Sequence, residues 1–560
     1  MRHDRRVSDH GTTVFRNGPV FRADAARSWA TAVAVRDGSV VAVGGDEEVG
    51  PYLRDADEVV DLAGRLLLPG FVDAHVHPVM GGLERMRCDL TGGRTLADYQ
   101  ATVREYVDLN PDRHWVLGGG WGMGAFEHGC PTAAQLDVVV GDRPVFLPNR
   151  DHHSAWASSR ALQLAGIDAS TPDPADGRIE RDAAGNPTGA LHEGAADLVE
   201  RLVPSNTQAD FDEALRVGQA YLHSLGIVGW QDAWVETGVP GPSVHEAYLR
   251  AQQAGTLTAR VVGSLWWPRE TTQDGVADQV AHFVKVRDEA AGAGGRYDAG
   301  TVKIMLDGVV ETGTAALLEG YLDSCGHPTD NTGLSFVGGD LLRTVVTQLD
   351  AAGFQVHFHV LGDRAVREAL DAVAEARRVN GTADRRHHLA HLQVVHPDDV
   401  PRFRAVGATA NLQALWAAHE PEMDDLTIPF LGEVRAAQQY PFADLLGAGA
   451  TLAMGSDWPV STPDPLAAIH VAVNRISPDA PAGTPAFLPG QAIPLPVAVA
   501  AYTAGSSYVS RLERVTGTIA VGHRADLALL DRDPFAAPTE QIAATLVDRT
   551  WVDGRLVHQA

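Results

Sequence analysis

The chain has 560 residues, 45% of them apolar and 21% charged, which is the composition of a globular protein rather than a disordered or fibrous one. At this length we expect about two to four domains, or one large barrel with additions. Aspartate and glutamate total 72 against 45 lysines and arginines, a formal charge of −27, so neither nucleic acid nor an anionic membrane is expected as a partner.

The cysteines and the N-terminal segment predict where the protein resides. Cys88, Cys130 and Cys325 are far apart and lack metal-type spacing, so we expect free thiols in a reducing compartment. The first residues contain no apolar run of the signal-peptide kind, and no stretch approaches ~18 uninterrupted apolar residues. We therefore expect a cytoplasmic protein without a transmembrane helix, and the sequence leaves a homodimer open.

The two ends of the chain share a β-type pattern. Residues 30–44 alternate apolar side chains around an Asp-Gly turn, which is typical of a hairpin. Similar short runs return at 516–533 and 550–557. The pattern predicts one small β domain, built from residues 1–66 and 510–560.

The middle of the chain contains eight short apolar runs, the later ones separated by amphipathic helical stretches such as 364–379. The runs lie at 67–77, 226–234, 259–267, 301–308, 354–363, 387–395, 408–416 and 451–459. This alternation predicts a parallel sheet, and eight units predict a (β/α)8 TIM-type barrel over residues 67–509. The long gap after the first strand predicts an inserted subdomain at about 85–205.

Side chains of metal-ligand type occur on several of these predicted strands. His75 and His77 project to the same side of the first strand, and two such imidazoles can hold one divalent ion at about 2.0–2.1 Å. The other candidates are Lys303, His357, His359, His391 and Asp457. Any one of them alone could be an ordinary buried side chain, but together they predict a metal site at the carboxyl end of the barrel.

The lysine content singles out one of these residues. Lys285 and Lys303 are the only lysines of the chain, and arginine supplies every other basic side chain except histidine. A lysine kept in such a background suggests chemistry that a guanidinium group cannot perform.

Taken together, these motifs resemble the amidohydrolase superfamily, and in particular the amidohydrolase-3 branch that includes N-substituted formamide deformylases. The resemblance spans nearly the whole chain, from LLPGFVDAHVHP through GGWGMGAFEHGCPTAAQLD, VKIMLDGVVETG, HFHVLGDRAV and MGSDWPV to TGTIAVGHRADLALLDRDP. It implies a β-sandwich at the termini and one or two divalent metal ions, with zinc as the expected metal. The implied ligands are His75, His77, Lys303, His359, His391 and Asp457, with His359 preferred to His357 for its place before GDRAV.

The same resemblance implies hydrolysis of an amide-type carbon–nitrogen bond in a small substrate. A bound zinc ion supplies hydroxide near neutral pH, Asp457 acts as general base, and His391 orients the carbonyl or ligates the metal. Five tryptophans near the carboxyl ends of predicted strands favour an apolar or aromatic substituent: Trp234, Trp266, Trp267, Trp416 and Trp458. Ester or lactone hydrolysis, decarboxylation, isomerisation and a catalytically silent binding protein remain alternatives.

Four further residues match recurring positions of the branch: Trp121, His153, Glu193 and Asp363. They are expected to touch substrate or to support the ligands, with structural packing as the alternative. The chain departs from the family at Ser158, where an asparagine is expected.

The role of Lys303 depends on the number of metal ions. Reaction with carbon dioxide would turn its amine into a carbamate, N6-carboxylysine, which can bridge two metals. The alternative is a salt bridge to Asp307 or Glu311 beside a single ion.

Overall fold

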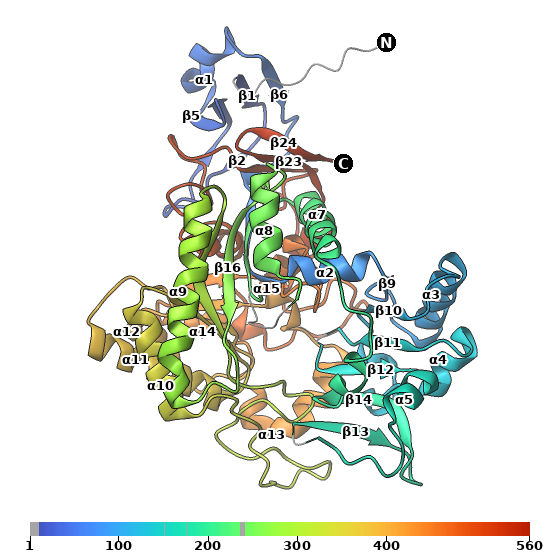
Figure 1. Cartoon of the computed structure of the whole chain (residues 1–560). Helices are drawn as coiled ribbons and strands as arrows, with labels where there is room; N and C mark the ends of the chain where they lie inside the picture. Colours follow the sequence, from blue (N-terminus) through green and yellow to red (C-terminus); the bar gives the residue numbers. More distant parts are fainter. Residues whose placement is uncertain (1–10, 151, 175, 236–240) are drawn as a thin grey trace.

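A computed structural model describes residues 11–150, 152–174, 176–235 and 241–560 (Figure 1). Its centre is a sheet of eight parallel strands that neighbour one another in chain order. They are β8 (Phe71–Val76), β15 (Ile227–Asp232), β16 (Arg260–Trp266), β17 (Tyr297–Met305), β18 (Gln355–Val360), β19 (His388–His391), β20 (Thr409–Leu412) and β21 (Thr451–Met454). Seven of the predicted apolar runs contain one of them and the run at 301–308 overlaps β17, which begins earlier, at Tyr297; this confirms the TIM-type barrel.

The barrel closes where its first and last strands meet. Beyond the end of β21, the backbone N–H of Asp457 donates to the carbonyl of His75 at 2.7 Å, and the N–H of His77 donates to the carbonyl of Trp458 at 2.8 Å. The side-chain amide of Asn411 in β20 also donates to the carbonyl of Ala74 at 2.9 Å. Side chains at the carboxyl ends of β8 and β21 therefore lie next to each other.

Amphipathic helices cover the outside of the barrel. In α11 (Asp363–Asn380), Val366, Leu370 and Val373 are buried at helical spacing while arginines occupy the opposite face. The other barrel helices are α2 (Pro78–Arg85), α7 (Gln208–Ser224), α8 (Val244–Gln253), α9 (Val276–Ala293), α10 (Gly339–Ala351), α12 (Val400–Val406), α13 (Ile428–Ala436), α14 (Phe442–Gly447), α15 (Pro465–Asn474), α16 (Leu495–Ala500) and α17 (Ser506–Val509). Among the described helices, none has both the length and the apolar character that a bilayer crossing requires.

Strands from both ends of the chain share one sheet beside the barrel. The six-stranded sheet has the order β24-β23-β22-β7-β2-β3. It combines β2 (Val20–Phe21), β3 (Trp29–Ala30) and β7 (Leu67–Pro69) with β22 (Leu527–Leu530), β23 (Val547–Val552) and β24 (Arg555–Gln559). A second sheet, β5-β4-β1-β6, contains β1 (Thr12–Arg16), β4 (Ala32–Arg36), β5 (Ser39–Gly44) and β6 (Glu58–Asp61), with α1 (Asp46–Leu53) packed on it. Phe15 and Trp551 pack edge to face between the two sheets, with ring centroids 5.1 Å apart.

A second six-stranded sheet lies between β8 and β15 in the sequence, at the lower right of Figure 1. Its strands are β9 (Cys88–Asp89), β10 (Val116–Gly119), β11 (Val145–Pro148), β12 (Ser154–Ala157), β13 (Gly177–Arg181) and β14 (Pro187–Glu193). Its helices are α3 (Leu96–Leu109), α4 (Ala133–Val140), α5 (Ser159–Ala165) and α6 (Asp197–Glu200). The three cysteines are free thiols.

One aspartate ties the terminal sheet to the barrel. Asp553 follows β23 and accepts hydrogen bonds from Arg260 of β16, from Arg296 and from Arg524. Burial opposes ionisation of this carboxyl, yet the three guanidinium groups lower the pKa of Asp553 to about 2. Arg260 also donates to Asp526 at 2.7 Å. Charged side chains of the terminal sheet and of the barrel therefore form one network of ion pairs.

Replacing this carboxylate leaves three guanidinium groups without their common acceptor. We expect Asp553→Ala to lower the free energy of unfolding by about 3–5 kcal/mol, measured by denaturant titration. Asp340→Ala, which removes a surface pair with Arg343, is the control and costs at most ~1 kcal/mol. The difference in the free energy of unfolding between Asp553→Ala and the wild type narrows as the pH falls from about 4 towards 2. Protonation of Asp553 in the wild type removes the same ion pairs that the substitution removes. Equal losses in the two variants would contradict this role.

Candidate metal centre

The predicted ligands converge at the carboxyl ends of the barrel strands. They come from five strands of the barrel or the segments just beyond them, and all but the half-buried His77 are buried. They are His75 and His77 at the end of β8, Lys303 in β17, His359 in β18, His391 at the end of β19 and Asp457 just beyond β21. The structure thus brings together six side chains that the sequence spreads over nearly 400 residues, as the 380-residue separation of His77 and Asp457 shows.

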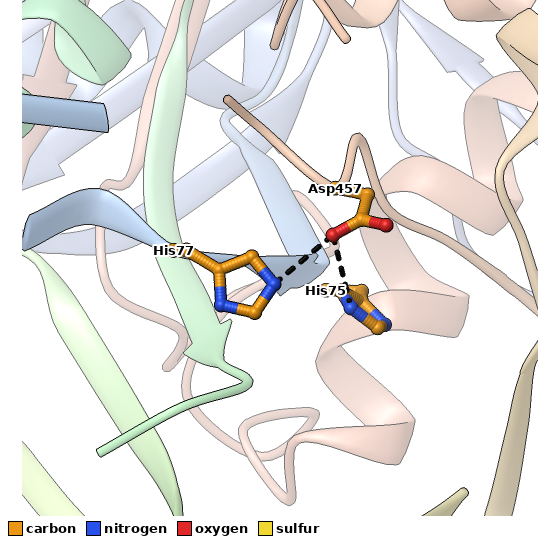
Figure 2. A group of neighbouring side chains, drawn as sticks. All are labelled: His75, His77 and Asp457. Atoms are coloured by element: carbon orange, nitrogen blue, oxygen red, sulfur yellow. Dashed lines mark hydrogen bonds and ion pairs between the residues drawn. The ribbon is translucent and has the colours of Figure 1, made fainter. Parts of the chain in front are cut away.

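Three of these side chains meet around one carboxylate oxygen (Figure 2). Oδ1 of Asp457 lies 3.0 Å from Nε2 of His77 and 3.2 Å from Nε2 of His75. Ligand atoms at about 2.0–2.2 Å from a tetrahedral ion are themselves ~3.3 Å apart, so these spacings suit a shared divalent ion. Nitrogen and carboxylate donors are the set that zinc binds.

The protonation states of this group also suit a cation. Burial lowers the pKa of His75 to about 3, with Lys303 adding to the shift, so the imidazole is neutral. Burial alone would raise the pKa of Asp457, but the neighbouring His75 and His77 hold it well below its usual value. A neutral imidazole and an ionised carboxylate are the forms that ligate metals.

The remaining predicted ligands form a second group beside the first. The rings of His359 and His391 lie 4.4 Å apart between centroids. Among the residues that the structure describes, Nε2 of His359 and both ring nitrogens of His391 are buried without a hydrogen-bond partner. Because an unsatisfied buried polar atom costs about 1–3 kcal/mol, three of them in one place fit a site that binds a ligand.

Lys303 belongs to both groups by position. Its Nζ lies 3.2 Å from Nε2 of His75, and burial lowers its pKa to about 7. Among the described residues, no ion pair joins Lys303 to Asp307 or Glu311. The carboxylate of Asp307 instead accepts backbone N–H groups, including those of Ala316 and Gly362. The salt-bridge alternative therefore has no counterpart in this structure.

The two histidines of β18 point the same way but differ in depth. Nε2 of His357 lies 2.9 Å from Nδ1 of His75, on the side of that ring away from Asp457. His359 is the residue whose ring packs against His391. The geometry favours His359 as the ligand and gives His357 the task of orienting His75.

Backbone contacts hold the first three ligands in place. Oδ1 of Asp73 accepts the N–H groups of His75 and Ser456, both at 3.0 Å, and so links β8 to the segment that carries Asp457. Gly455 permits this close approach, since an added Cβ would lie 2.5 Å from the backbone nitrogen of His75. Sequence reasoning assigned no role to Asp73, although its place two residues before His75 puts it on the same strand face.

Two ligands also have unusual backbone conformations. His391 has φ of 79° and Asp457 has φ of 57°, both in the left-handed region. A non-glycine residue in this conformation destabilises the folded state by about 1–3 kcal/mol, and such residues cluster at functional sites. The amide N–H of His391 donates to Oε1 of Gln413 at 2.6 Å, a second supporting contact that the sequence did not reveal.

The four additional candidates separate into two pairs. Nδ1 of His153 donates to Oε1 of Glu193 at 2.9 Å, and the His153 ring lies 6.3 Å from that of His359, so this pair borders the candidate metal centre. Trp121 is instead buried in the core of the inserted sheet, where its Nε1 donates to the carbonyl of Leu147. Asp363 begins α11 and accepts the N–H of Leu318. The structure therefore gives Trp121 and Asp363 packing and loop-anchoring contacts away from the ligands.

Three of the five singled-out tryptophans lie beside the ligands. The Trp234 ring is 6.4 Å from that of His77 and 5.1 Å from that of Trp266, and Trp416 stacks on His391 at 5.2 Å. Trp267 packs against Phe283, and Trp458 fits against the backbone of Gly81. The aromatic wall predicted from the sequence is thus formed by part of the set.

Several known proteins are similar to this chain over most of its length. A family model described as the amidohydrolase family matches residues 58–558. The chain is 30% identical to the putative amidohydrolase YtcJ of Bacillus subtilis over 536 residues, which cover 94% of this chain and 96% of the relative. It is 28% identical to the N-substituted formamide deformylase of Arthrobacter pascens over 564 residues, 97% of each chain. A solved structure of an uncharacterized metal-dependent hydrolase from Pyrococcus furiosus shares the fold, with a TM-score of 0.69, 24% identity and coverage of 93% of this chain and 99% of that one.

The contact at Gly455 can be tested without touching a ligand. We expect Gly455→Ala to push β8 away from the Asp457 segment, to lower bound metal and to reduce the free energy of unfolding by about 1–3 kcal/mol. Gly447→Ala is the matched control, because it ends α14 with open space at the Cβ position. Metal analysis and denaturant titration give the readouts, and a Gly455→Ala protein with full metal content would refute the packing argument.

Proposed function

Because the chain belongs to the amidohydrolase family, we propose that it is a metal-dependent hydrolase of an amide-type carbon–nitrogen bond in a small substrate. The observation that carries this proposal is the meeting of His75, His77 and Asp457 around one point at the carboxyl end of the barrel. The choice of bond draws support from the relative named as an N-substituted formamide deformylase. The intact ligand set argues against a catalytically silent protein.

The donor atoms fit one or two divalent ions, with zinc proposed as the metal. His75, His77 and Asp457 would hold the first ion, and His359 and His391 would hold the second. When bound, zinc lowers the pKa of water towards about 7 and polarises a carbonyl group.

The chain's own groups supply the proton transfers. The Asp457 carboxylate is ionised, so it can accept a proton from water and pass it to the leaving nitrogen. His391 presents two unpartnered nitrogens beside it, one of which can donate to the substrate carbonyl if it is not bound to metal. His153, held by Glu193, lies next to His359 and is placed to orient the substrate.

The aromatic side chains define the proposed substrate class. Trp234 and Trp266 pack together beside His77 and form one wall of the site. Such a wall favours an apolar or aromatic substituent on the amide. The acidic surface and the free thiols support a small-molecule substrate and a cytoplasmic setting as part of the same proposal.

The experiment is a hydrolysis panel on metal-loaded protein. Matched N-aryl and N-alkyl formamides and acetamides are compared with the corresponding esters and lactones, and kcat/KM is measured for each. We expect the amides with aromatic substituents to be the best substrates and Asp457→Asn to lose turnover by about 10²–10⁴-fold while it keeps metal. A panel in which only esters turn over would contradict the proposed bond.

We also propose that Lys303 carries a carbamate that bridges two ions. Its neutral amine takes up carbon dioxide and releases one proton to solvent, which places an anion beside the ligands; from the ammonium form, two protons are released. The contact of Nζ with Nε2 of His75 and the burial of the amine beside the predicted ligands support this assignment.

Because the chain has only two lysines, a carbamate on Lys303 can be detected directly by ¹³C NMR. We expect protein equilibrated with ¹³C-bicarbonate to give one carbamate resonance that disappears in Lys303→Ala and persists in Lys285→Arg. Lys303→Ala should lose activity and regain part of it with added short carboxylates, whereas Lys303→Arg should stay inactive. An active Lys303→Arg protein, or a wild type without the resonance, would refute the carbamate.

A further inference from the structure

A second cluster of ligand-type side chains lies in the inserted sheet, outside the metal centre. Cys130 precedes α4, Glu180 lies in β13 and His192 lies in β14, and these strands are neighbours in Figure 1. Nε2 of His192 is 3.8 Å from Sγ of Cys130 and 3.4 Å from Oε2 of Glu180. One ligand atom from each residue falls within 4.8 Å of the other two.

The spacing of this cluster matches coordination of one ion. Around a tetrahedral zinc ion with bonds of about 2.3 Å to sulfur and 2.0–2.1 Å to nitrogen or oxygen, neighbouring ligand atoms are ~3.3–3.6 Å apart. Both observed separations are close to these values. His192 is buried and the other two are half-buried, which leaves a side of the cluster open to water as a fourth ligand.

A neighbouring hydroxyl group orients the His192 ring for metal binding. Nδ1 of His192 lies 2.8 Å from the hydroxyl oxygen of Ser154 in the adjacent strand β12, a contact that fixes the ring with Nε2 towards the cluster. Metal-bound histidines commonly use their other nitrogen in this way. Arg178 lies 3.1 Å from Oε2 of Glu180 but is largely exposed, so it can move aside.

We propose that Cys130, Glu180 and His192 form a structural zinc site that fastens the segment before α4 to strands β13 and β14. Thiolate and carboxylate together balance the two charges of the ion, and the thiol proton passes to solvent. Burial raises the pKa of the Cys130 thiol to about 11, so the sulfur is protonated until the ion binds. The site also steadies the end of β14, where Glu193 holds His153 beside the metal centre.

The sulfur ligand gives this site a signature that the metal centre cannot produce. The catalytic ligands proposed above offer only nitrogen and oxygen, whereas cobalt bound to a thiolate has a charge-transfer absorption band in the near ultraviolet. We expect the full-length protein reconstituted with Co²⁺ to show this band. Cys130→Ser should abolish it and lower bound metal by one equivalent per chain.

A matched cysteine variant separates this cluster from the rest of the chain. Cys325 is exposed, with Asp323 and His327 within reach, so Cys325→Ser is the control that should keep the band. Loss of the band in Cys325→Ser, its survival in Cys130→Ser, or its absence from the wild type would overturn the proposal.

A measurement on the wild type covers the case in which Cys130→Ser does not fold. Peptide mapping after alkylation should show that Zn²⁺ slows modification of Cys130 at least tenfold and leaves that of Cys325 unchanged. Equal alkylation rates of Cys130 with and without Zn²⁺ would overturn the proposal. Since neither readout depends on turnover, both are independent of the proposed hydrolase activity.

Discussion

The metal centre depends on the contact that closes the barrel. Two backbone hydrogen bonds join the ends of β8 and β21, from Asp457 to His75 and from His77 to Trp458. Asp73 reinforces them by accepting the amides of both segments, and the contact is so close that only glycine fits at position 455. The ligand geometry is therefore a consequence of barrel closure, in which side-chain donors far apart in sequence are fixed by main-chain contacts.

The same site contains several buried polar groups that have no hydrogen-bond partner among the described residues. In the described part of the chain, buried imidazole nitrogens of His359 and His391 have no hydrogen-bond partner, and the Lys303 amine is buried against His75. In a low-dielectric interior such groups destabilise the fold unless a ligand completes them. A bound cation would satisfy several of them at once, which explains how a barrel can tolerate them. The left-handed backbone at His391 and Asp457 adds to the energy stored there.

The sequence predicted the barrel and its ligand positions because both depend on local pattern. Continuous apolar runs separate parallel strands from the helices between them, and the two-residue period places His75 and His77 on one face. The same period could not separate His357 from His359, because only their depth in the barrel differs. Trp121 and Asp363 were placed by resemblance, and their actual contacts depend on tertiary packing. The Cys130 cluster has no local signal, since its cysteine and histidine are 62 residues apart.

The contact that closes the barrel can form only late in the synthesis of the chain. β8 pairs with β15 on one side, but its contacts on the other side, with Asp457 and Trp458, need the segment beyond β21. At about 5–20 residues per second, the 380 residues from His77 to Asp457 take roughly 20–80 s to make. Throughout that interval the histidine pair is exposed on a nascent chain without its carboxylate. The group of His75, His77 and Asp457 can therefore form only after Asp457 has been synthesised, late in the production of the chain.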